Sequence, residues 1–157
     1  MVSNEYYNKR RRGSAVVEAA LIFLPLFAFI FAVIDISLVI FMKNTIRQAA
    51  REGVRYGITA QTRSGMCQDD SIKAVVQENA AGFLSGSSGL SHIQVQYYDP
   101  QTFAAAGNRP GNIVEVSVTN LPWSWIVPLW HDAGQIQVSA SVAGLLEAAP
   151  NGVMPCR

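Results

Sequence analysis

A basic patch, one glycine and one carboxylate stand immediately before a long apolar run. Their order is Arg10-Arg11-Arg12-Gly13-Ser14-Ala15-Val16-Val17-Glu18. A carboxylate in a membrane helix is costly, by about 2.5–3.5 kcal/mol at the centre and less near the ends, so it favours a cationic partner. The chemistry that this spacing offers is ion pairing at a membrane boundary. The alternative is that Glu18 lies among lipid headgroups and Gly13 is an ordinary linker residue.

The other reactive side chains do not form a catalytic or metal-binding pattern. His92 and His131 are the only histidines, and neither lies at a metal-ligand spacing from Cys67 or Cys156. The sequence contains no Gly-rich phosphate loop, nucleophile elbow or paired-carboxylate motif. We therefore expect no enzymatic activity, metal, cofactor or small-molecule substrate.

Residues 19–42 are apolar apart from Asp35 and Ser37. About 24 helical residues at a rise of 1.5 Å give roughly 36 Å, which is enough to cross the hydrocarbon of a bilayer. The run is longer than the core of a cleavable secretory signal and continues into Lys43 and Asn44. This pattern predicts one transmembrane segment, residues 19–42, that stays in the mature protein.

Two residues interrupt this apolar run. Pro25 removes one helical hydrogen bond and is expected to bend the helix. Asp35 is an ionisable group within a span, which usually marks a contact. The position of Asp35, roughly 10 Å from the end of the run, leaves two alternatives: a partner membrane protein, or water at the outer interface.

Composition excludes one class of partner and suggests an orientation. The chain is 50% hydrophobic and 15% charged, with a net charge of +1. It has no basic stripe interleaved with aromatic residues, so we expect no nucleic-acid binding.

The orientation of the span depends on its flanking charges. Basic residues are almost equally numerous on the two sides, so the positive-inside rule gives only a weak preference. The contiguous basic tail, with both cysteines on the other side, favours a cytoplasmic N-terminus.

The segment around Gly13 resembles a type IV prepilin leader. In that family a membrane-embedded prepilin peptidase cuts after the glycine, which implies cleavage between Gly13 and Ser14 and makes Glu18 the fifth residue of the mature chain. The similarity continues through Glu18-Ala19-Ala20-Leu21-Ile22, Pro25 and Asn44-Thr45-Ile46-Arg47-Gln48-Ala49-Ala50-Arg51-Glu52-Gly53-Val54-Arg55. This combination resembles TadE-like pilus assembly proteins of the tight-adherence system. Ala19 departs from the aromatic residue often found there, so a TadF-like paralogue is the other assignment.

The resemblance, which covers about residues 10–60, implies a function. The expected protein is a minor pilin-like subunit, or pseudopilin, or an assembly factor for a pilus used in adhesion and secretion. Its expected partners are the prepilin peptidase, other pilin-like subunits and the assembly machinery of the bacterial inner membrane, with the C-terminal domain in the periplasm. We hypothesise that Glu18 pairs with the Ser14 amine of its own or a neighbouring chain. The alternative is an uncleaved bitopic protein that anchors an interaction domain.

Helical periodicity continues beyond the apolar run, so a helix is predicted for residues 14–60. Ala49, Gly53 and Gly57 form a ridge of small residues that lets another helix or a sheet approach closely, from the same chain or a partner. Arg47 and Arg51, followed by Arg55, form a row at i, i+4 spacing, which suits an acidic partner or a solvated face.

The C-terminal part, residues 71–157, is predicted to be a small α+β domain after a polar linker, residues 61–70. A helix capped by residues 69–71 is expected first. Three segments then alternate apolar and polar side chains and predict a small, mainly antiparallel sheet: residues 93–97, 114–118 and 135–140.

Two features of this domain are left with alternatives. Residues 121–130 contain two prolines and three tryptophans, too many breaks for a central strand. The tryptophans either seal the core, rest at the membrane interface or contact another subunit. Cys67 and Cys156 either form a bridge, which contributes on the order of 4 kcal/mol by closing a loop of about 90 residues, or are free thiols.

Overall fold

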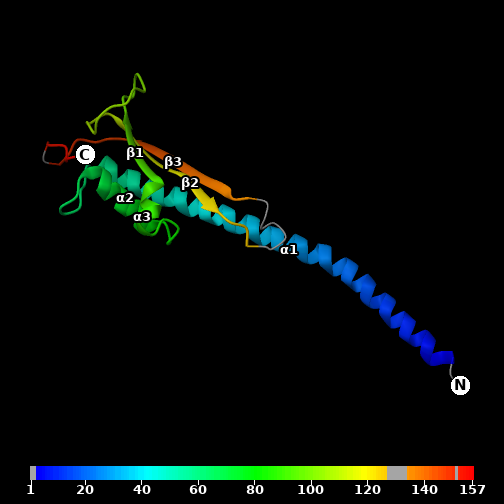
Figure 1. Cartoon of the computed structure of the whole chain (residues 1–157). Coiled ribbons are helices and arrows are strands. Elements are labelled where there is room, and N and C mark those ends of the chain that lie inside the picture. Colours follow the sequence, from blue (N-terminus) through cyan, green and yellow to red (C-terminus); the bar gives the residue numbers. More distant parts are fainter. Residues whose placement is uncertain (1–2, 127–133, 151) are drawn as a thin grey trace. The chain divides into compact units, whose positions relative to one another are not determined.

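A computed structural model describes residues 3–126, 134–150 and 152–157, with side chains from Ser14 onward. The chain divides into two compact units. The N-terminal unit comprises Met1–Leu38 and Trp125–Gly134, and the head comprises Val39–Ser124 and Gln135–Arg157. The elements follow in the order α1 (Ser3–Ile58), α2 (Gln68–Asn79), α3 (Gly86–Ser91), β1 (Ile93–Tyr98), β2 (Ile113–Trp123) and β3 (Ile136–Leu145) (Figure 1). The predicted α+β fold is confirmed.

Helix α1 contains 56 residues and contributes to both units. Its apolar residues favour a helix in lipid because all their backbone groups bond within the segment. Pro25 lies inside α1 and does not end it. After Ile58 the chain turns at Ala60, which has φ of 51° and whose N–H donates to the Gly57 carbonyl at 3.0 Å. A residue in the left-handed region is a common way to end a helix.

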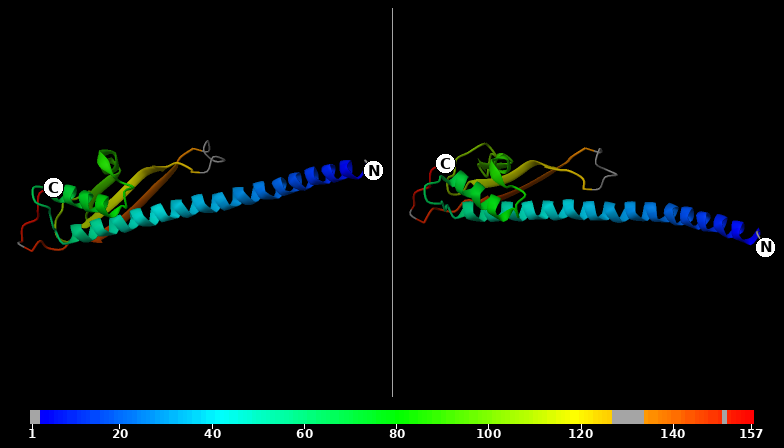
Figure 2. Two further views of the ribbon diagram at one scale, coloured as in Figure 1. Left: turned by 90° about the horizontal axis from the view of Figure 1, so that it is seen from below. Right: turned by 60° about the horizontal axis from the view of Figure 1, so that its bottom comes forward.

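The head is built on a three-stranded antiparallel sheet in the order β1-β2-β3. Alternate residues of β2, including Val114, Val116 and Val118, are fully buried. This alternation places one face of the sheet against the core. Figure 2 shows the strands running beside the part of α1 that belongs to the head. The three predicted strands are thus present and pair as a meander.

Strand β2 extends farther than its alternating pattern predicted. Val118 pairs with Ala140 and Leu121 with Val138, so three steps on β2 oppose two on β3, which is a β-bulge. Asn120, with φ of 57°, supplies the left-handed residue of this bulge. Residues 121–123, which contain a proline and were not expected in a central strand, form the end of β2. Because β1 pairs only as far as Val118, this part of β2 has one neighbour, and an edge accommodates proline.

Helix α2 starts earlier than expected and is not capped as predicted. Its N-cap residue is Cys67, without a side-chain capping bond. Asp69 and Asp70 lie in the first turn instead, where their charge interacts favourably with the helix dipole. The Ser71 hydroxyl donates to the Cys67 carbonyl at 2.8 Å. The helix ends at Asn79, so Phe83 and Leu84 reach the core from the turn that follows.

Candidate functional site

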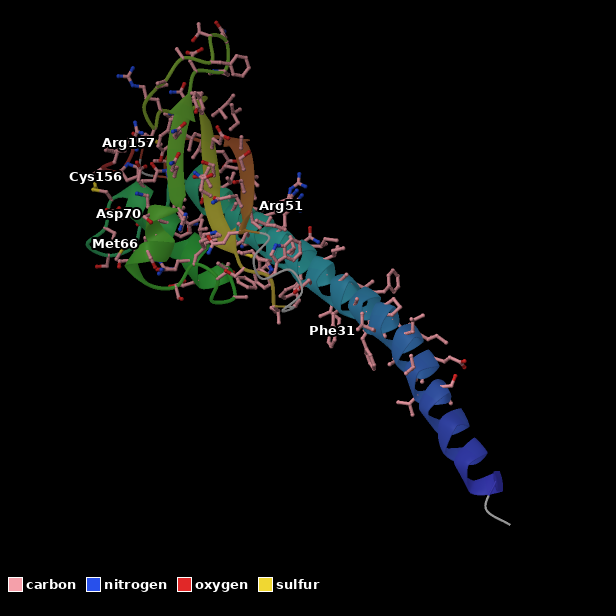
Figure 3. All side chains as sticks on the ribbon, turned by 45° about the vertical axis from the view of Figure 1, so that its right-hand side comes forward. Phe31, Arg51, Met66, Asp70, Cys156 and Arg157 are labelled. Atoms are coloured by element: carbon pink, nitrogen blue, oxygen red, sulfur yellow. A yellow bond between two sulfur atoms is a disulfide. The ribbon has the colours of Figure 1, made fainter. Side chains whose placement is uncertain are left out.

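The first candidate surface is the apolar stretch of α1 in the N-terminal unit. Leu21, Leu24 and Phe29 are 74%, 71% and 68% exposed. Phe31 points away from the helix axis (Figure 3), and its ring stacks on that of Phe27 one turn earlier. Such an exposed apolar surface needs lipid or other helices to cover it. By length and composition, α1 is a helix that can span a membrane, which is consistent with membrane anchoring.

The predicted cleavage junction lies within α1. Gly13 and Ser14 are both helical. Glycine is among the weakest helix formers, by about 1 kcal/mol relative to alanine. The Ser14 hydroxyl donates to Glu18 Oε1 at 3.4 Å, and the Glu18 side chain is exposed. The structure therefore places the carboxylate one helical turn from the residue that would become the new N-terminus.

Asp35 is fully buried although it lies among exposed apolar residues. Its Oδ1 accepts a hydrogen bond from the backbone N–H of Ile126 at 3.2 Å. Ile126 follows β2, and both residues belong to the N-terminal unit. From the sequence, the contact expected for Asp35 was a partner protein or water. The structure gives it a contact within its own chain, across 91 positions.

The ridge of small residues on α1 packs within the head. A Cβ atom added at Gly53 would lie 2.4 Å from Val76 Cγ2, and one at Gly57 would lie 2.8 Å from Ile72 Cδ1. Ala49 is fully buried in the same core. These distances show that α1 and α2 approach each other closely because the ridge lacks side chains.

The arginine row differs along its length. Arg47 and Arg51 are exposed, and Figure 3 shows Arg51 projecting outward from α1. Arg55 forms an ion pair with Glu52, 2.8 Å between Nη2 and Oε2, on the same helix. Exposed i, i+3 pairs of this kind contribute little, about 0.3–0.5 kcal/mol.

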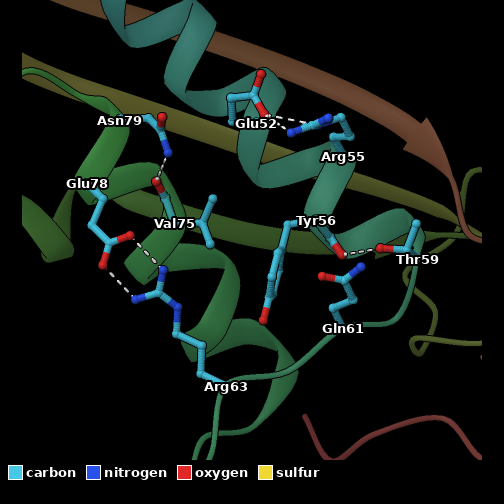
Figure 4. Close-up of a pocket in the computed structure, with 9 residues that line it drawn as sticks. All are labelled: Glu52, Arg55, Tyr56, Thr59, Gln61, Arg63, Val75, Glu78 and Asn79. Carbon is cyan, nitrogen blue, oxygen red and sulfur yellow. Dashed lines mark hydrogen bonds and ion pairs between the residues drawn. The ribbon is translucent and has the colours of Figure 1, made fainter.

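A hollow of about 470 Å³ lies between the end of α1, α2 and the loop that joins them (Figure 4). Its charged residues pair with each other. Arg63 makes two hydrogen bonds of 2.6 Å with the carboxylate of Glu78. This bonding raises the pKa of Arg63 and lowers the pKa of Glu78. The pair was not predictable from the sequence, because the two residues lie in different elements.

The C-terminal residues are bonded to the start of α2 and contact β1. Cys67 and Cys156 form a disulfide, and the Gln68 N–H donates to the Cys156 carbonyl at 2.7 Å. Asp69 accepts a hydrogen bond from the Tyr97 hydroxyl at 2.7 Å and pairs with Arg157 at 3.1 Å. Burial is the main cause that raises the pKa of Tyr97. These contacts, made by Cys67, Asp69, Tyr97, Cys156 and Arg157, link the C-terminus to α2 and β1.

The remaining candidate residues are dispersed. In the part of the chain that the structure describes, no three His, Cys, Asp or Glu side chains gather as metal ligands. His92 Nδ1 lies 2.9 Å from the Thr119 carbonyl oxygen. Trp123 packs on the core, and its buried indole N–H meets no hydrogen-bond acceptor among the described residues. His131 and Trp130 lie outside the described residues.

Comparison with known proteins finds one match, in the N-terminal part of the chain. A family model described as TadE-like protein matches residues 13–55. No curated protein and no solved structure matches the chain. The match begins at Gly13 and ends at Arg55, within the segment whose motifs predicted it. It confirms the resemblance of this segment to TadE-like proteins.

Proposed function

We propose that this chain is a pilin-like minor subunit or assembly factor of a tight-adherence pilus, matured by prepilin peptidase cleavage after Gly13. The observation that carries the proposal is the coincidence of two features. The TadE-like match starts at Gly13, and the helix that follows exposes large apolar side chains such as Leu21 and Phe29. A helix of this kind suits lipid before assembly and other apolar helices afterwards.

The proposed role of Glu18 follows from its place on α1. Cleavage after Gly13 would create an α-amino group at Ser14, which carries a positive charge at neutral pH because its pKa is about 7.7–8.0. The Ser14 hydroxyl already lies 3.4 Å from Glu18 Oε1. The new amine would therefore form within reach of Glu18 of its own chain and, in an array of parallel helices, of a neighbour. Such a pair would offset the cost of a carboxylate in hydrocarbon and set axial register.

The proposed placement is a single span in the bacterial inner membrane, with a cytoplasmic N-terminus and the head in the periplasm. The disulfide between Cys67 and Cys156 supports this orientation, because disulfides persist in oxidising compartments. The proposed partners are the prepilin peptidase, other pilin-like subunits and the assembly machinery. The function is recognition between helices, and no catalytic step is assigned to the chain.

The test uses piliation in the native host. A chromosomal Gly13→Leu variant is expected to insert into the membrane, keep its leader and abolish pili. Gly107→Ala is the matched control, because a Cβ at Gly107 meets no atom within 4 Å. Normal pili on Gly13→Leu cells whose protein retains the leader would favour the alternative, an uncleaved bitopic anchor for an interaction domain.

A further inference from the structure

The contact between Asp35 and the loop after β2 bears on where the membrane ends. The backbone N–H of Ile126 donates to Asp35 Oδ1 at 3.2 Å, and Asp35 is fully buried. Residues 124–126 are neither helix nor strand. The side chain of Ile126 is 62% exposed, and that of Trp125 is partly buried. An irregular backbone with an exposed apolar side chain thus lies beside α1 at the level of Asp35.

Irregular backbone is not tolerated where it faces the hydrocarbon of a bilayer. Its N–H and C=O groups find no water there, and each unsatisfied group costs several kcal/mol. The loop at residues 124–126 therefore lies at or outside the hydrocarbon edge. Because Ile126 is hydrogen-bonded to Asp35, that edge is at or before Asp35 on the helix.

The head provides an independent reason for the same boundary. Met42 is 2% exposed and belongs to the core of the head. The ring of Phe41 packs edge to face on Phe83, with 6.2 Å between centroids. From about Val39 onward, one face of the helix is therefore packed against the folded head. Lipid cannot surround the last turn of the span that composition alone predicts.

We propose that Asp35 marks the outer edge of the hydrocarbon and that Trp125 and Ile126 rest in the lipid interface of the outer leaflet. The membrane span is then residues 15–34 rather than 19–42. Twenty helical residues give about 30 Å, which equals the usual hydrocarbon thickness. Tryptophan prefers this interface because its ring is apolar and its N–H is polar. This inference rests on the proposed membrane anchoring of α1.

The shifted span changes the setting of Glu18. Glu18 is three positions after residue 15, so its Cα atom lies about 4.5 Å inside the cytoplasmic edge of the hydrocarbon. The loop after β2 meanwhile becomes a second membrane contact of the chain, formed by a region of the sequence far from the span. Its ligand is the phospholipid interface itself.

Quenching of tryptophan fluorescence by brominated lipids tests the proposal on the full chain in phosphatidylcholine vesicles. A variant with Trp125 as the only tryptophan, Trp123→Phe with Trp130→Phe, reports the loop. Two reference variants carry Phe29→Trp or Phe103→Trp with all three native tryptophans changed to phenylalanine. Phe103 is 71% exposed in the head, outside the proposed contact. We expect Trp125 to lose most of its emission to lipids brominated near the headgroup and less to lipids brominated near the chain ends.

The two references separate the possible failures. Quenching of Phe29→Trp by deep bromines shows that the helix spans; if it is absent, the anchoring itself fails, and this inference fails with it. If Phe29→Trp is quenched but Trp125 resembles Phe103→Trp, the anchor holds and the loop contact is rejected. Quenching of Trp125 chiefly by deep bromines would reject Asp35 as the boundary.

The role of Asp35 is tested in the same Trp125-only chain. Asp35→Asn keeps an oxygen that accepts a hydrogen bond from the Ile126 N–H. Quenching of Trp125 in this variant is therefore expected to equal that in the Trp125-only chain with Asp35 unchanged. Asp35→Leu removes the acceptor, and shallow quenching is expected to fall toward the Phe103→Trp level. Equal quenching in Asp35→Leu and Asp35→Asn would show that this hydrogen bond does not hold the loop at the interface.

Discussion

At the residue scale, the structure separates carboxylates by their partners. Glu18 is exposed on an apolar helix with Ser14 one turn away. Asp35 is buried against backbone from the loop after β2. Glu78 is held by Arg63 at the surface of the head. Of these three carboxylates, only Glu18 is placed to meet the positive charge that the proposed cleavage would create.

Loss of the Glu18 carboxylate is expected to prevent assembly without preventing insertion. Glu18→Ala lowers the cost of entering lipid but removes the partner of the Ser14 amine. Its level in the inner membrane should equal that of the wild type by immunoblot, while pili counted by electron microscopy should be lost. Glu147→Ala, which removes an exposed head carboxylate, is the control. Normal piliation of the Glu18→Ala strain would defeat the ion-pair hypothesis.

Because Arg63 and Glu78 are paired, the unfolding free energy of the head is expected to fall at acid pH. Hydrogen bonding to Arg63 lowers the pKa of Glu78. A carboxyl whose pKa is lower in the folded chain stabilises it above the ordinary pKa of about 4.3, and that stabilisation is lost as the pH falls through the lowered value. Glu78→Gln should therefore show a smaller drop in unfolding free energy between pH 6 and acid conditions, roughly pH 3.

This pH dependence is measured by urea unfolding of the full chain in detergent. Some acid sensitivity should persist in Glu78→Gln, because backbone N–H groups of Thr102 and Gln101 lower the pKa of Asp99. Glu147→Gln is the control, since Glu147 is outside the hollow. An identical pH profile for Glu78→Gln and the wild type would show that the pair does not stabilise the fold.

Local patterns point to candidate leader residues but not to long-range contacts. Gly13 and Glu18 are proposed because the chemistry expected of them depends on spacing within one short segment. The partner of Asp35 was not predictable in this way, because Ile126 is 91 positions away and acts through its backbone. The Glu78 partner Arg63 lies in a loop, where no periodicity indicates what a side chain faces.

At the scale of elements, close packing between α1 and α2 depends on glycine. A Cβ at Gly53 would meet Val76 Cγ2 at 2.4 Å, and one at Gly144 on β3 would meet Ile58 Cδ1 at 2.6 Å. Real Cβ atoms do not approach so closely, so larger residues would force the helix away from α2 or from the sheet. The head therefore constrains both faces of the last turns of α1.

Gly53→Ala is expected to destabilise the head. Alanine favours the helix by about 1 kcal/mol, but overpacking against Val76 typically costs 1–3 kcal/mol, so we expect a net loss of roughly 0–2 kcal/mol. Urea unfolding of the full chain in detergent measures the change. In the double variant Gly53→Ala with Val76→Ala, the added methyl group no longer meets the Val76 side chain. The double variant should therefore be more stable than the sum of the two single losses in unfolding free energy predicts.

The matched control for Gly53→Ala is Gly107→Ala, where the added Cβ has no neighbour within 4 Å. If Gly53→Ala were more stable than the wild type and showed no coupling with Val76→Ala, the close approach of α1 and α2 would be disproved. The small-residue ridge would then need another explanation.

Elements with strong local patterns were predicted, and their ends were not. The three strands follow from alternation, as in Val114, Val116 and Val118. The extension of β2 to Trp123 depends on the length of β3 and on the early end of β1 pairing at Val118. The length of β3 and the extent of β1 pairing are properties of neighbouring strands, so they cannot be predicted from residues 119–123 themselves.

At the scale of the whole molecule, one covalent link closes most of the head. Cys67 and Cys156 are 89 positions apart, and the Tyr97, Asp69 and Arg157 contacts lie next to this link. Replacing both cysteines by serine should lower the unfolding free energy by about 2–5 kcal/mol, because the unfolded chain is no longer constrained.

Urea unfolding of the full chain in detergent measures that loss, with a thiol count before and after reduction. The reduced wild type should unfold at the same urea concentration as the double serine variant. Two reactive thiols in the unreduced protein, or a serine variant as stable as the wild type, would contradict the stabilising role of the link.

Removal of the leader with retention of the apolar helix is tested by the mass and N-terminal sequence of the protein purified from membranes of its native host. We predict a chain that begins at Ser14 in the wild type and at Met1 in a Gly13→Leu variant prepared alongside. A wild-type chain that retains residues 1–13 would contradict prepilin-type maturation and leave a simple membrane anchor.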